Sequence, residues 1–267
     1  MSTILITGAA GGIGTLMRPR LARPDRVLRL LDVEPLEAGP GEEIVRASVT
    51  DLAAMTDACQ GADAVIHLGG RSTEAAWARI LETNIDGTYK VFEAARRAGV
   101  PRVIFASSNH VVGFYTPDEY PLPESAPALP DTYYGVSKVT GEALGALYHH
   151  RYGLDVICIR ILTCFPKPGD QRALSTWLSP DDCARLFEAC LAAEKPGYRV
   201  VYGVSANTRG GWVSLEGAAA LGYSAKDDAE VYAEEVLAER GELGPDDPVL
   251  QHLGGHFILP RLDAENL

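Results

Sequence analysis

A glycine-rich run near the N-terminus, "ILITGAAGGIG" at residues 4–14, constrains the fold more than any other feature of the sequence. A short aliphatic stretch typical of a strand leads directly into this run, and a helical pattern follows it. Gly8, Gly11 and Gly14 stand where the absence of a side chain lets the backbone turn tightly, approach a pyrophosphate and pack a helix against a strand. The run, which also holds Gly12 and Ile13, therefore predicts a dinucleotide-binding strand–turn–helix unit.

The remainder of the chain alternates between strand-like and helix-like patterns. The strand-like runs are short and almost continuously apolar, which is typical of strands buried on both faces of a parallel sheet. They span residues 1–7, 26–32, 43–49, 63–69, 102–108 and 154–161, and amphipathic stretches of helical length lie at 53–59, 75–98 and 134–152. This order predicts an α/β fold with a doubly wound parallel Rossmann sheet.

The regular alternation of strand-like and helix-like stretches ends after residue 161. The segment "FPKPGDQ" at 165–171 reads as a loop, residues 180–193 as a helix that begins after Ser179, and 198–205 as one more strand. The chain contains no Pro/Ser-rich linker that would tether a separate unit. We therefore expect residues 1–161 to form an NAD-binding domain and 162–267 a small C-terminal substrate-binding cap, interleaved with the main fold.

Composition excludes several classes of partner. The formal net charge of the 267-residue chain is −12, so nucleic acid and anionic membranes would be repelled, and an anionic substrate would need a local cation. No apolar run is long enough to cross a membrane, and no signal-peptide pattern opens the chain. The five cysteines form no Cys-x-x-Cys pair, and Cys59, Cys158 and Cys190 have apolar neighbours that suggest packing. We expect reduced thiols and a cytoplasmic location.

An acidic residue at the end of the second strand-like run bears on the choice of cofactor. Asp32 follows the glycine run by about twenty residues, where a carboxylate accepts hydrogen bonds from the ribose hydroxyls of a dinucleotide. Asp32 and Glu34 would repel a ribose phosphate, and no arginine follows Asp32 in the loop. The sequence thus predicts NAD rather than NADP, and Arg29 inside the strand is the one argument against it.

The stretch "DTYYGVSK" at 131–138 carries the candidate chemistry. Positions four apart share a helix face, so Tyr134 and Lys138 can point into one site while Tyr133 points elsewhere. A tyrosine with a pKa of about 10 needs roughly 4 kcal/mol of phenolate stabilisation to act as a base near neutral pH, and a lysine beside it supplies positive charge. With Ser108 at the end of the fifth strand-like run, these residues form a candidate set for proton abstraction coupled to hydride transfer.

These motifs resemble those of the extended short-chain dehydrogenases/reductases over essentially the whole chain. The resemblance implies that Ser108, Tyr134 and Lys138 are catalytic and that Asn84 shapes a water route to the active site. It further implies cofactor contacts from Asp51, Leu68, Gly69, Gly70, Tyr134, Lys138 and Cys164, in addition to the glycine run and Asp32. For Asp51, a helix N-cap ahead of "LAAMTDA" is an equally good interpretation.

Five segments, "HLGGRS", "FASSNH", "DTYYGVSK", "KPGDQRALSTWLS" and "LGGHF", also resemble, in this order, segments of a narrower family, the uronate dehydrogenases. That resemblance implies oxidation of the anomeric hydroxyl of galacturonate or glucuronate to an aldarolactone, with reduction of NAD. It places substrate contacts at Ser72, Ser108, Asn109, His110, Tyr134, Thr163, Arg172 and Phe257.

Physical reasoning about the same residues agrees with a carboxylate substrate. An acidic protein needs a fixed cation with two-pronged geometry to bind a carboxylate, and Arg172 is the best placed. Pairing of Arg172 with Asp170 and a purely structural role for His110 remain open. The spacing of His252 and His256 offers no third ligand, so we expect no metal site.

Two other functions share the fold. A nucleotide-sugar epimerase or dehydratase would use the same serine, tyrosine and lysine but carries a larger C-terminal region, and a non-catalytic NAD-sensing protein usually loses the tyrosine or the lysine. Exposed helices of this fold commonly pair between subunits, so a homo-oligomer is compatible with the sequence.

Overall fold

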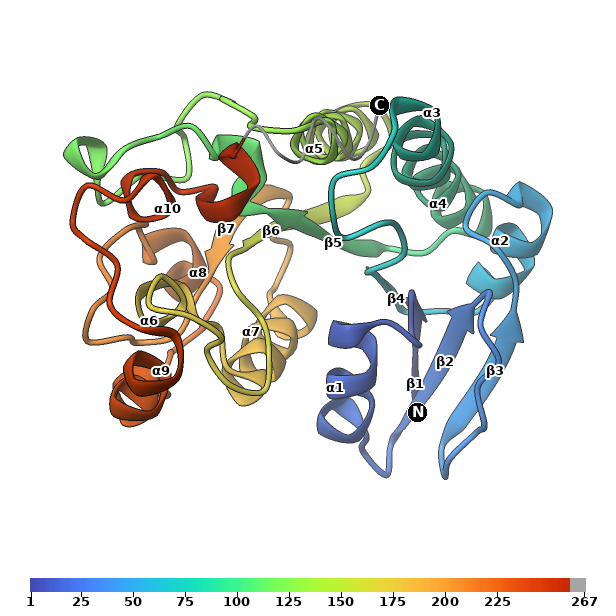
Figure 1. Ribbon diagram of the computed structural model, residues 1–267. Coiled ribbons are helices and arrows are strands. Elements are labelled where there is room, and N and C mark those ends of the chain that lie inside the picture. Colours follow the sequence, from blue (N-terminus) through green and yellow to red (C-terminus); the bar gives the residue numbers. More distant parts are fainter. Residues whose placement is uncertain (260–267) are drawn as a thin grey trace.

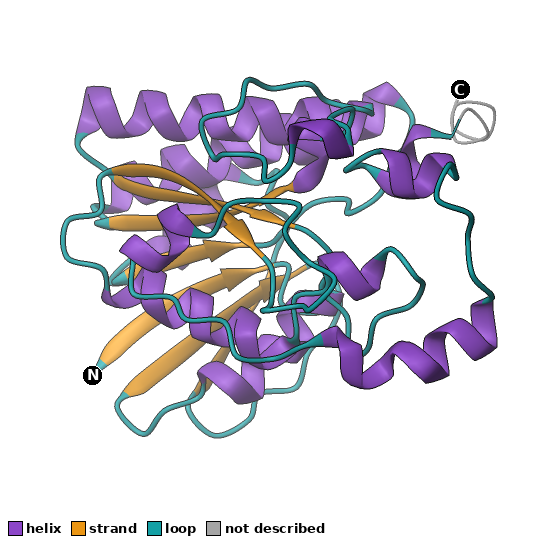
Figure 2. Ribbon diagram, turned by 90° about the vertical axis from the view of Figure 1, so that its left-hand side faces the viewer, coloured by secondary structure: helices purple, strands orange, loops and turns teal. Residues whose placement is uncertain are grey.

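The computed structural model describes residues 1–259, which build a parallel β-sheet with helices on both faces (Figures 1 and 2). The seven-stranded sheet has the order β3-β2-β1-β4-β5-β6-β7, and every neighbouring pair is parallel. The strands are β1 (Ser2–Thr7), β2 (Arg26–Asp32), β3 (Glu42–Arg46), β4 (Ala64–His67), β5 (Arg102–Ser108), β6 (Asp155–Ile161) and β7 (Tyr198–Gly203). The predicted fold class, a doubly wound Rossmann sheet, is confirmed.

The helices divide between the two faces of the sheet. On one face α1 packs beside α7, and on the other α2, α4 and α5 lie side by side. The α-helices are α1 (Gly12–Leu21), α2 (Leu52–Cys59), α3 (Trp77–Ile80), α4 (Gly87–Ala98), α5 (Tyr133–Tyr152), α6 (Ala173–Thr176), α7 (Pro180–Ala192), α8 (Glu216–Ala220), α9 (Ala233–Arg240) and α10 (Pro248–Gln251). Shorter turns are the π-helical η1 (Leu81–Asp86) and the 3-10 helices η2 (Asn109–Val112), η3 (Pro117–Glu119), η4 (Ala229–Tyr232) and η5 (Gly255–Ile258).

Each face has its own apolar core, because the strands alternate their side chains between two helical layers. Met17 and Leu21 of α1 meet Phe187 of α7 beneath one face. Phe92 of α4 and Tyr148 of α5 stack beneath the other, with ring centroids 5.4 Å apart. Burial on both sides explains the almost continuous apolar runs in the sequence.

Most predicted element boundaries hold to within a residue or two, with two exceptions. The third strand ends at Arg46 rather than at residue 49, because the chain leaves the sheet to reach the N-cap of α2. The single helix expected at 75–98 is interrupted by the π-helical turn η1. A π turn inserts an extra residue into the helix, a distortion that frequently marks a functional site.

The region after residue 161 contributes β7 to the main sheet and then wraps around the carboxyl ends of β5 to β7 (Figure 1). The division at 161 stays a prediction, and the last eight residues of the predicted cap, 260–267, lie outside the described part of the chain.

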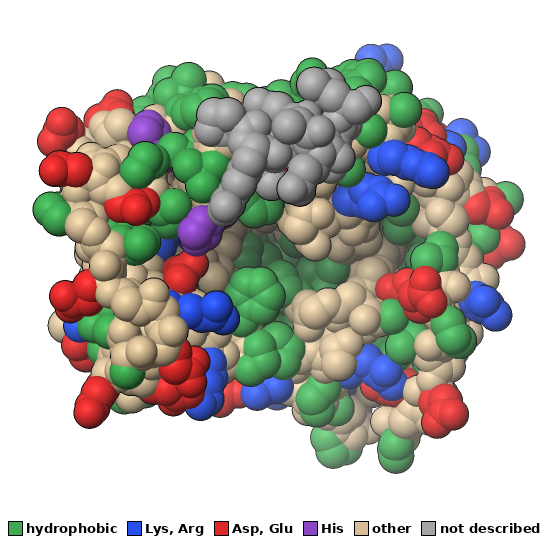
Figure 3. All heavy atoms as spheres, in the orientation of Figure 1, with side chains coloured by type: hydrophobic (Ala, Val, Ile, Leu, Met, Phe, Trp, Pro, Cys, Tyr) green, Lys and Arg blue, Asp and Glu red, His purple; other side chains and the backbone are tan. Residues whose placement is uncertain are grey.

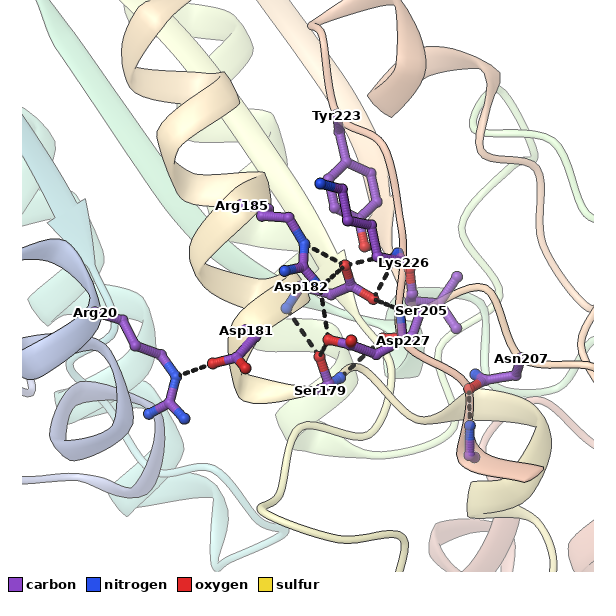
Figure 4. Close-up of polar contacts among 12 residues, drawn as sticks. Arg20, Ser179, Asp181, Asp182, Arg185, Ser205, Asn207, Tyr223, Lys226 and Asp227 are labelled. Atoms are coloured by element: carbon purple, nitrogen blue, oxygen red, sulfur yellow. Dashed lines mark hydrogen bonds and ion pairs between the residues drawn. The ribbon is translucent and has the colours of Figure 1, made fainter. Parts of the chain in front are cut away.

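A polar network anchors this wrapping segment to the start of α7 (Figure 4). Ser179 caps α7 by accepting a hydrogen bond from the backbone N–H of Asp182 at 2.8 Å. The fully buried Asp182 carboxylate accepts the backbone N–H groups of Lys226 and Asp227, at 3.0 and 2.9 Å, and is paired with Arg185. One buried carboxylate therefore joins the helix to a loop more than forty residues further along the chain.

Within residues 1–259, no helix is long and apolar enough to cross a membrane. The predicted packing role of Cys59, Cys158 and Cys190 agrees with their burial, since all three thiols lie in the apolar cores.

Candidate functional site

The order of strands in the sheet reverses between β1 and β4, and a cavity of about 730 Å³ opens at the carboxyl ends of the strands around this point. Open α/β sheets bind ligands at such switch points. Figure 3 shows the same face of the molecule hollowed near its centre. The cavity extends from the glycine turn after β1 to the segment that holds η5.

The glycine turn forms one end of the cavity, and its glycines have different tasks. Gly8 has a φ of +70°, and a Cβ there would lie 2.7 Å from the backbone nitrogen of Gly69. A Cβ at Gly14 would lie 2.5 Å from the carbonyl oxygen of Gly8. Gly12 has open space in front of it, and α1 begins there with no side-chain cap. The N–H groups at the start of α1 are therefore free to bind a pyrophosphate.

Asp32 lies at the carboxyl end of β2, beside this turn. Its carboxylate accepts the backbone N–H groups of Ala10 at 2.9 Å and Glu34 at 3.1 Å, so one edge of the turn is fixed by the residue expected to bind ribose. Arg29 points away, because it is paired with Glu43 and donates to two backbone carbonyls near the end of α2. Arg29 is therefore engaged elsewhere and does not support NADP over NAD.

The structure also reveals a cation near Asp32 that the sequence analysis missed. Arg46 is the register partner of Asp32 across β2 and β3, and its side chain donates to the carbonyl of Val33 at 3.2 Å. Arg46 is the last residue of β3 and does not lie in the loop directly after Asp32. The pairing of β2 with β3 brings the two residues together.

The wall beside β4 consists of Leu68, Gly69 and Gly70, all of which line the cavity. Gly70 adopts a φ of +141°, which favours glycine. Asp51 does not line the cavity. It caps α2 instead, accepting the N–H groups of Ala53 and Ala54, so the helix-cap interpretation is confirmed while the adenine contact stays a prediction.

Ser108, Tyr134 and Lys138 meet in the middle of the cavity. Ser108 ends β5, and Tyr134 and Lys138 lie one turn apart on the buried side of α5. The Lys138 Nζ lies 5.4 Å from the centroid of the Tyr134 ring and donates to the carbonyl of Ala106 at 2.7 Å. Tyr133 is exposed and packs against Trp77, as the helix periodicity predicts.

Burial opposes ionisation of both titratable groups. It raises the pKa of Tyr134 to about 12, although a hydrogen bond with Ser108 acts in the opposite direction. It lowers the pKa of Lys138 to about 8. Bringing the phenol into a useful range therefore requires more positive charge beside it, as the sequence analysis expects from Lys138 together with an oxidised nicotinamide.

Two neighbours of this set hold it in place. Both Ser107 and Ser108 line the cavity, but the Ser107 hydroxyl is engaged because it donates to Glu142 at 2.6 Å. Asn84, in the π-helical turn η1, bonds both backbone groups of Arg71 and the hydroxyl of Ser137. The π turn thus ties the loop after β4 to the helix that carries Tyr134.

At the other end of the cavity lies Arg172, just before α6. Only 9% of this residue is exposed, and one of its guanidinium nitrogens donates to the carbonyl of Leu253. Asp170 does not pair with it, because that carboxylate accepts the N–H of Ala173 and contacts His256 instead. Within the described part of the chain, Arg172 has no carboxylate partner and its Nε has no hydrogen-bond acceptor. Burial lowers its pKa.

His110 and Asn109 line the cavity between Arg172 and Tyr134. The ring of His110 stacks on Phe257 with centroids 4.1 Å apart and meets Tyr134 edge-on at 5.6 Å. Asn109 donates to the carbonyl of Leu253 at 2.8 Å. The C-terminal segment therefore lines the cavity with the ring of Phe257 and holds Asn109 and Arg172 through the carbonyl of Leu253.

Nineteen of the twenty residues predicted for the site line this one cavity, Asp51 being the exception. They are Gly8, Gly11, Gly12, Ile13, Gly14, Asp32, Leu68, Gly69, Gly70, Ser72, Ser108, Asn109, His110, Tyr134, Lys138, Thr163, Cys164, Arg172 and Phe257. The sequence analysis missed Asp131, which bonds His110, and Glu74, which bonds the start of α5. Glu74 belongs to none of the quoted segments, and although Asp131 opens "DTYYGVSK", nothing in its spacing indicates a contact with His110.

A doubly wound sheet, an open glycine turn and a serine–tyrosine–lysine set in one cavity define the class: a dinucleotide-dependent enzyme of the short-chain dehydrogenase type. Comparison with known sequences agrees, since residues 4–180 match the NAD dependent epimerase/dehydratase family. The chain belongs to this family. The family's description names NAD, the cofactor expected from the sequence.

Individual relatives are more specific. The chain is 46% identical to a uronate dehydrogenase of Pseudomonas putida, over 96% of this chain and 95% of that protein. It is 39% identical to an NAD-dependent glucose-6-phosphate dehydrogenase of Haloferax volcanii, over 85% and 94% of the two chains. The structure of a mutant uronate dehydrogenase from Agrobacterium tumefaciens, complexed with NAD, superimposes with a TM-score of 0.91 at 41% identity and covers 97% of each chain. The predicted resemblance to uronate dehydrogenases is confirmed.

Proposed function

We propose that this protein oxidises the anomeric carbon of a free hexuronic acid, galacturonate or glucuronate, to the aldarolactone with NAD as the acceptor. The observation that carries the proposal is the buried guanidinium of Arg172, which shares a cavity with Ser108, Tyr134 and Lys138. The names of the relatives most similar to this chain support the same substrate class.

A buried cation without an anionic partner is costly, because desolvation disfavours the charged form. No acid within residues 1–259 is in ion-pair contact with Arg172, and Arg172 is one of the residues that line the cavity. A substrate carboxylate would satisfy the unpaired charge with two parallel hydrogen bonds. A neutral sugar would not, so the electrostatics favour a uronate over an aldose.

The proton leaves the anomeric hydroxyl through Tyr134 in this proposal. Ser108 orients the hydroxyl toward the phenolate, and Lys138 stabilises the phenolate by its charge. The open start of α1, Asp32 and the wall formed by Leu68, Gly69 and Gly70 hold NAD. When bound, NAD accepts the hydride and adds positive charge beside the phenol. Asn109, His110, Thr163 and Ser72 bind the remaining sugar hydroxyls.

The test is NADH absorbance with the purified protein and a panel of free uronic acids, neutral aldoses, glucose 6-phosphate and nucleotide sugars. We expect steady NADH formation with galacturonate or glucuronate. Turnover of a nucleotide sugar, with NAD that stays bound and does not exchange, would identify an epimerase or dehydratase instead. NAD binding without turnover of any sugar would identify a sensing protein.

A further inference from the structure

We propose that Asp131 is a positioning residue that fixes the ring of His110, so that the Nε2 atom of His110 is the one presented to the substrate. The inference rests on the proposed function, in which His110 binds a sugar hydroxyl. It assigns a task to the carboxylate that opens the "DTYYGVSK" segment, to which the sequence analysis gave no role.

Asp131 contacts the ring of His110 directly. Asp131 precedes α5, and its Oδ2 lies 2.7 Å from the Nδ1 of His110. The side chain of Asp131 is fully buried and that of His110 is 11% exposed. A carboxylate accepts and does not donate, so Nδ1 carries the proton in this bond. The other ring nitrogen, Nε2, is then the one available to the cavity that His110 lines.

The space around the Asp131 carboxylate is tightly enclosed. A Cβ at Gly113 or at Gly254 would overlap the Asp131 carboxylate, and a Cβ at Gly135 would lie 3.2 Å from its Oδ1. These glycines come from three separate segments: the end of η2, the start of α5 and the C-terminal region. The fold therefore brings three side-chain-free positions around one acidic group.

Asp131 has few hydrogen-bond donors around it. Its hydrogen-bond donors within residues 1–259 are the Nδ1 of His110 and the hydroxyl of Thr132, which lies 2.9 Å from Oδ1. No lysine or arginine in that range is paired with it. Because an unpartnered buried carboxylate is costly, Asp131 holds His110 strongly in one orientation. A carboxylate that orients a histidine ring and sets its tautomer is a recurring arrangement in sites where the other nitrogen does the work.

His110 is also confined on its other sides. The ring of Phe257 stacks on one of its faces, and Tyr134 meets it edge-on. These two rings restrict the positions that the His110 ring can take. Asp131 then selects, between the two flipped orientations of a confined ring, the one that directs Nε2 to the substrate.

A double-mutant cycle tests this with the full-length protein at saturating NAD. Asp131→Asn keeps the shape but allows an amide to donate to Nδ1 and so change the tautomer. We expect it to lower kcat/KM for the preferred uronate by roughly 10-fold, with KM taking most of the change, and to leave the Kd for NAD and the melting temperature nearly unchanged. In a His110→Ala background the same substitution should cost nothing more. In a His256→Ala background, which removes a different histidine that lines the cavity, Asp131→Asn should lower kcat/KM as much as it does in the wild type.

Equal losses in the His110→Ala background and in the wild type would overturn the proposal, because Asp131 would then act on the fold and not through His110. The tautomer gives a readout that does not depend on turnover. In protein labelled with ¹⁵N-histidine, the signal that disappears in His110→Ala should have the shifts of an Nδ1-protonated ring, and Asp131→Asn should change them. An Nε2–H tautomer in the wild type would also overturn the proposal. Absence of uronate oxidation by the wild type would instead contradict the proposed function.

Discussion

At the scale of single residues, the site combines groups whose charged forms are disfavoured by burial. Tyr134 and Lys138 are both buried, and their pKa values move to about 12 and about 8. Arg172 is a buried cation that makes no ion-pair contact with a described carboxylate, although Asp170 and Asp131 are near enough to favour its charged form. A positive charge beside Tyr134 would stabilise its phenolate, and an anionic ligand beside Arg172 would stabilise its guanidinium; perturbed groups of this kind are typical of sites for binding and proton transfer.

Replacing Tyr134 with phenylalanine should separate chemistry from binding. The ring and its packing against His110 remain, but the group that takes the proton is lost. We expect kcat to fall by roughly 100-fold or more while the affinity for NAD changes little. Steady-state kinetics and NAD titration measure the two effects. Activity within a few-fold of the wild type would show that another group is the base.

Arg172 decides the substrate class. Arg172→Ala should lower kcat/KM for galacturonate by roughly 30-fold or more, because a charge-assisted pair of about 2 to 4 kcal/mol is lost. Galactose, which has no carboxylate, should lose little. Arg172→Lys should recover only part of the activity, since an ammonium lacks the two-pronged geometry. Equal losses for both sugars would mean that Arg172 supports the fold, through Leu253, rather than the substrate.

Asp32 should select NAD over NADP by supplying both the ribose acceptor and the repulsion of a phosphate. Asp32→Ala should weaken NAD binding and shift the ratio of kcat/KM values toward NADP, because Arg46 then remains beside the ribose site without an opposing charge. The double variant Asp32→Ala, Arg46→Ala is the control, and it should lose the gain toward NADP. An unchanged cofactor ratio in the single variant would argue against Asp32 as the selector.

At the scale of elements, the start of α5 is where the site is assembled. Thr132 caps the helix, and Glu74 accepts the backbone N–H groups of Tyr133 and Tyr134, at 3.3 and 2.8 Å. Asn84 adds a second tie between the loop after β4 and the same helix. The loop that carries Ser72 and the helix that carries Tyr134 are therefore fastened together.

Removing the first of these ties should affect turnover more than cofactor binding. Glu74→Ala leaves two N–H groups at the start of α5 without their acceptor and frees the loop, so we expect kcat to fall several-fold and stability to fall by about 1 kcal/mol. Glu74→Gln retains an acceptor and should lose less. Glu82→Ala removes an exposed carboxylate from η1 and serves as the control. Wild-type kinetics in Glu74→Ala would show that Thr132 alone positions the helix.

At the scale of the whole molecule, the C-terminal region shapes the substrate end of the cavity, although much of it lies far from the cofactor end. It reaches the site through Leu253 and Phe257 and is held to the main fold by the network at the start of α7 (Figure 4). Asp182, at the centre of that network, is fully buried, whereas its neighbour Asp181 is exposed and pairs with Arg20 at the surface.

These adjacent aspartates offer a matched comparison of stability. Asp182→Ala removes the acceptor of two backbone N–H groups as well as the partner of Arg185, so we expect a loss of roughly 2 to 4 kcal/mol in the free energy of unfolding. Asp181→Ala breaks an exposed pair and should cost less than about 1 kcal/mol. Urea unfolding of both variants measures the difference. Similar midpoints for the two would contradict a structural role for the network.

The sequence by itself determined the parts of this protein that are read along the chain. Almost continuously apolar runs that alternate with helical stretches predicted the parallel sheet, because strands buried on both faces have no polar side. The glycine spacing after β1 and the four-residue spacing of Tyr134 and Lys138 depend on one turn and one helix, so local rules predict them. The substrate-side positions came from resemblance, and the structure gathers them in the same cavity.

Tertiary structure decided which of these groups have partners. Strand pairing places Arg46 beside Asp32, the π turn brings Asn84 to Ser137, and glycines from three segments enclose Asp131 next to His110. The folded structure also shows that Asp170 bonds Ala173 and His256 and makes no ion-pair contact with Arg172. Many of these contacts join residues that are far apart along the chain, as Asn84 with Ser137 and Asp131 with Gly254, and hydrophobic periodicity and local propensity carry no information about them. They depend on how the loops pack at the carboxyl ends of the strands, which only the folded chain defines.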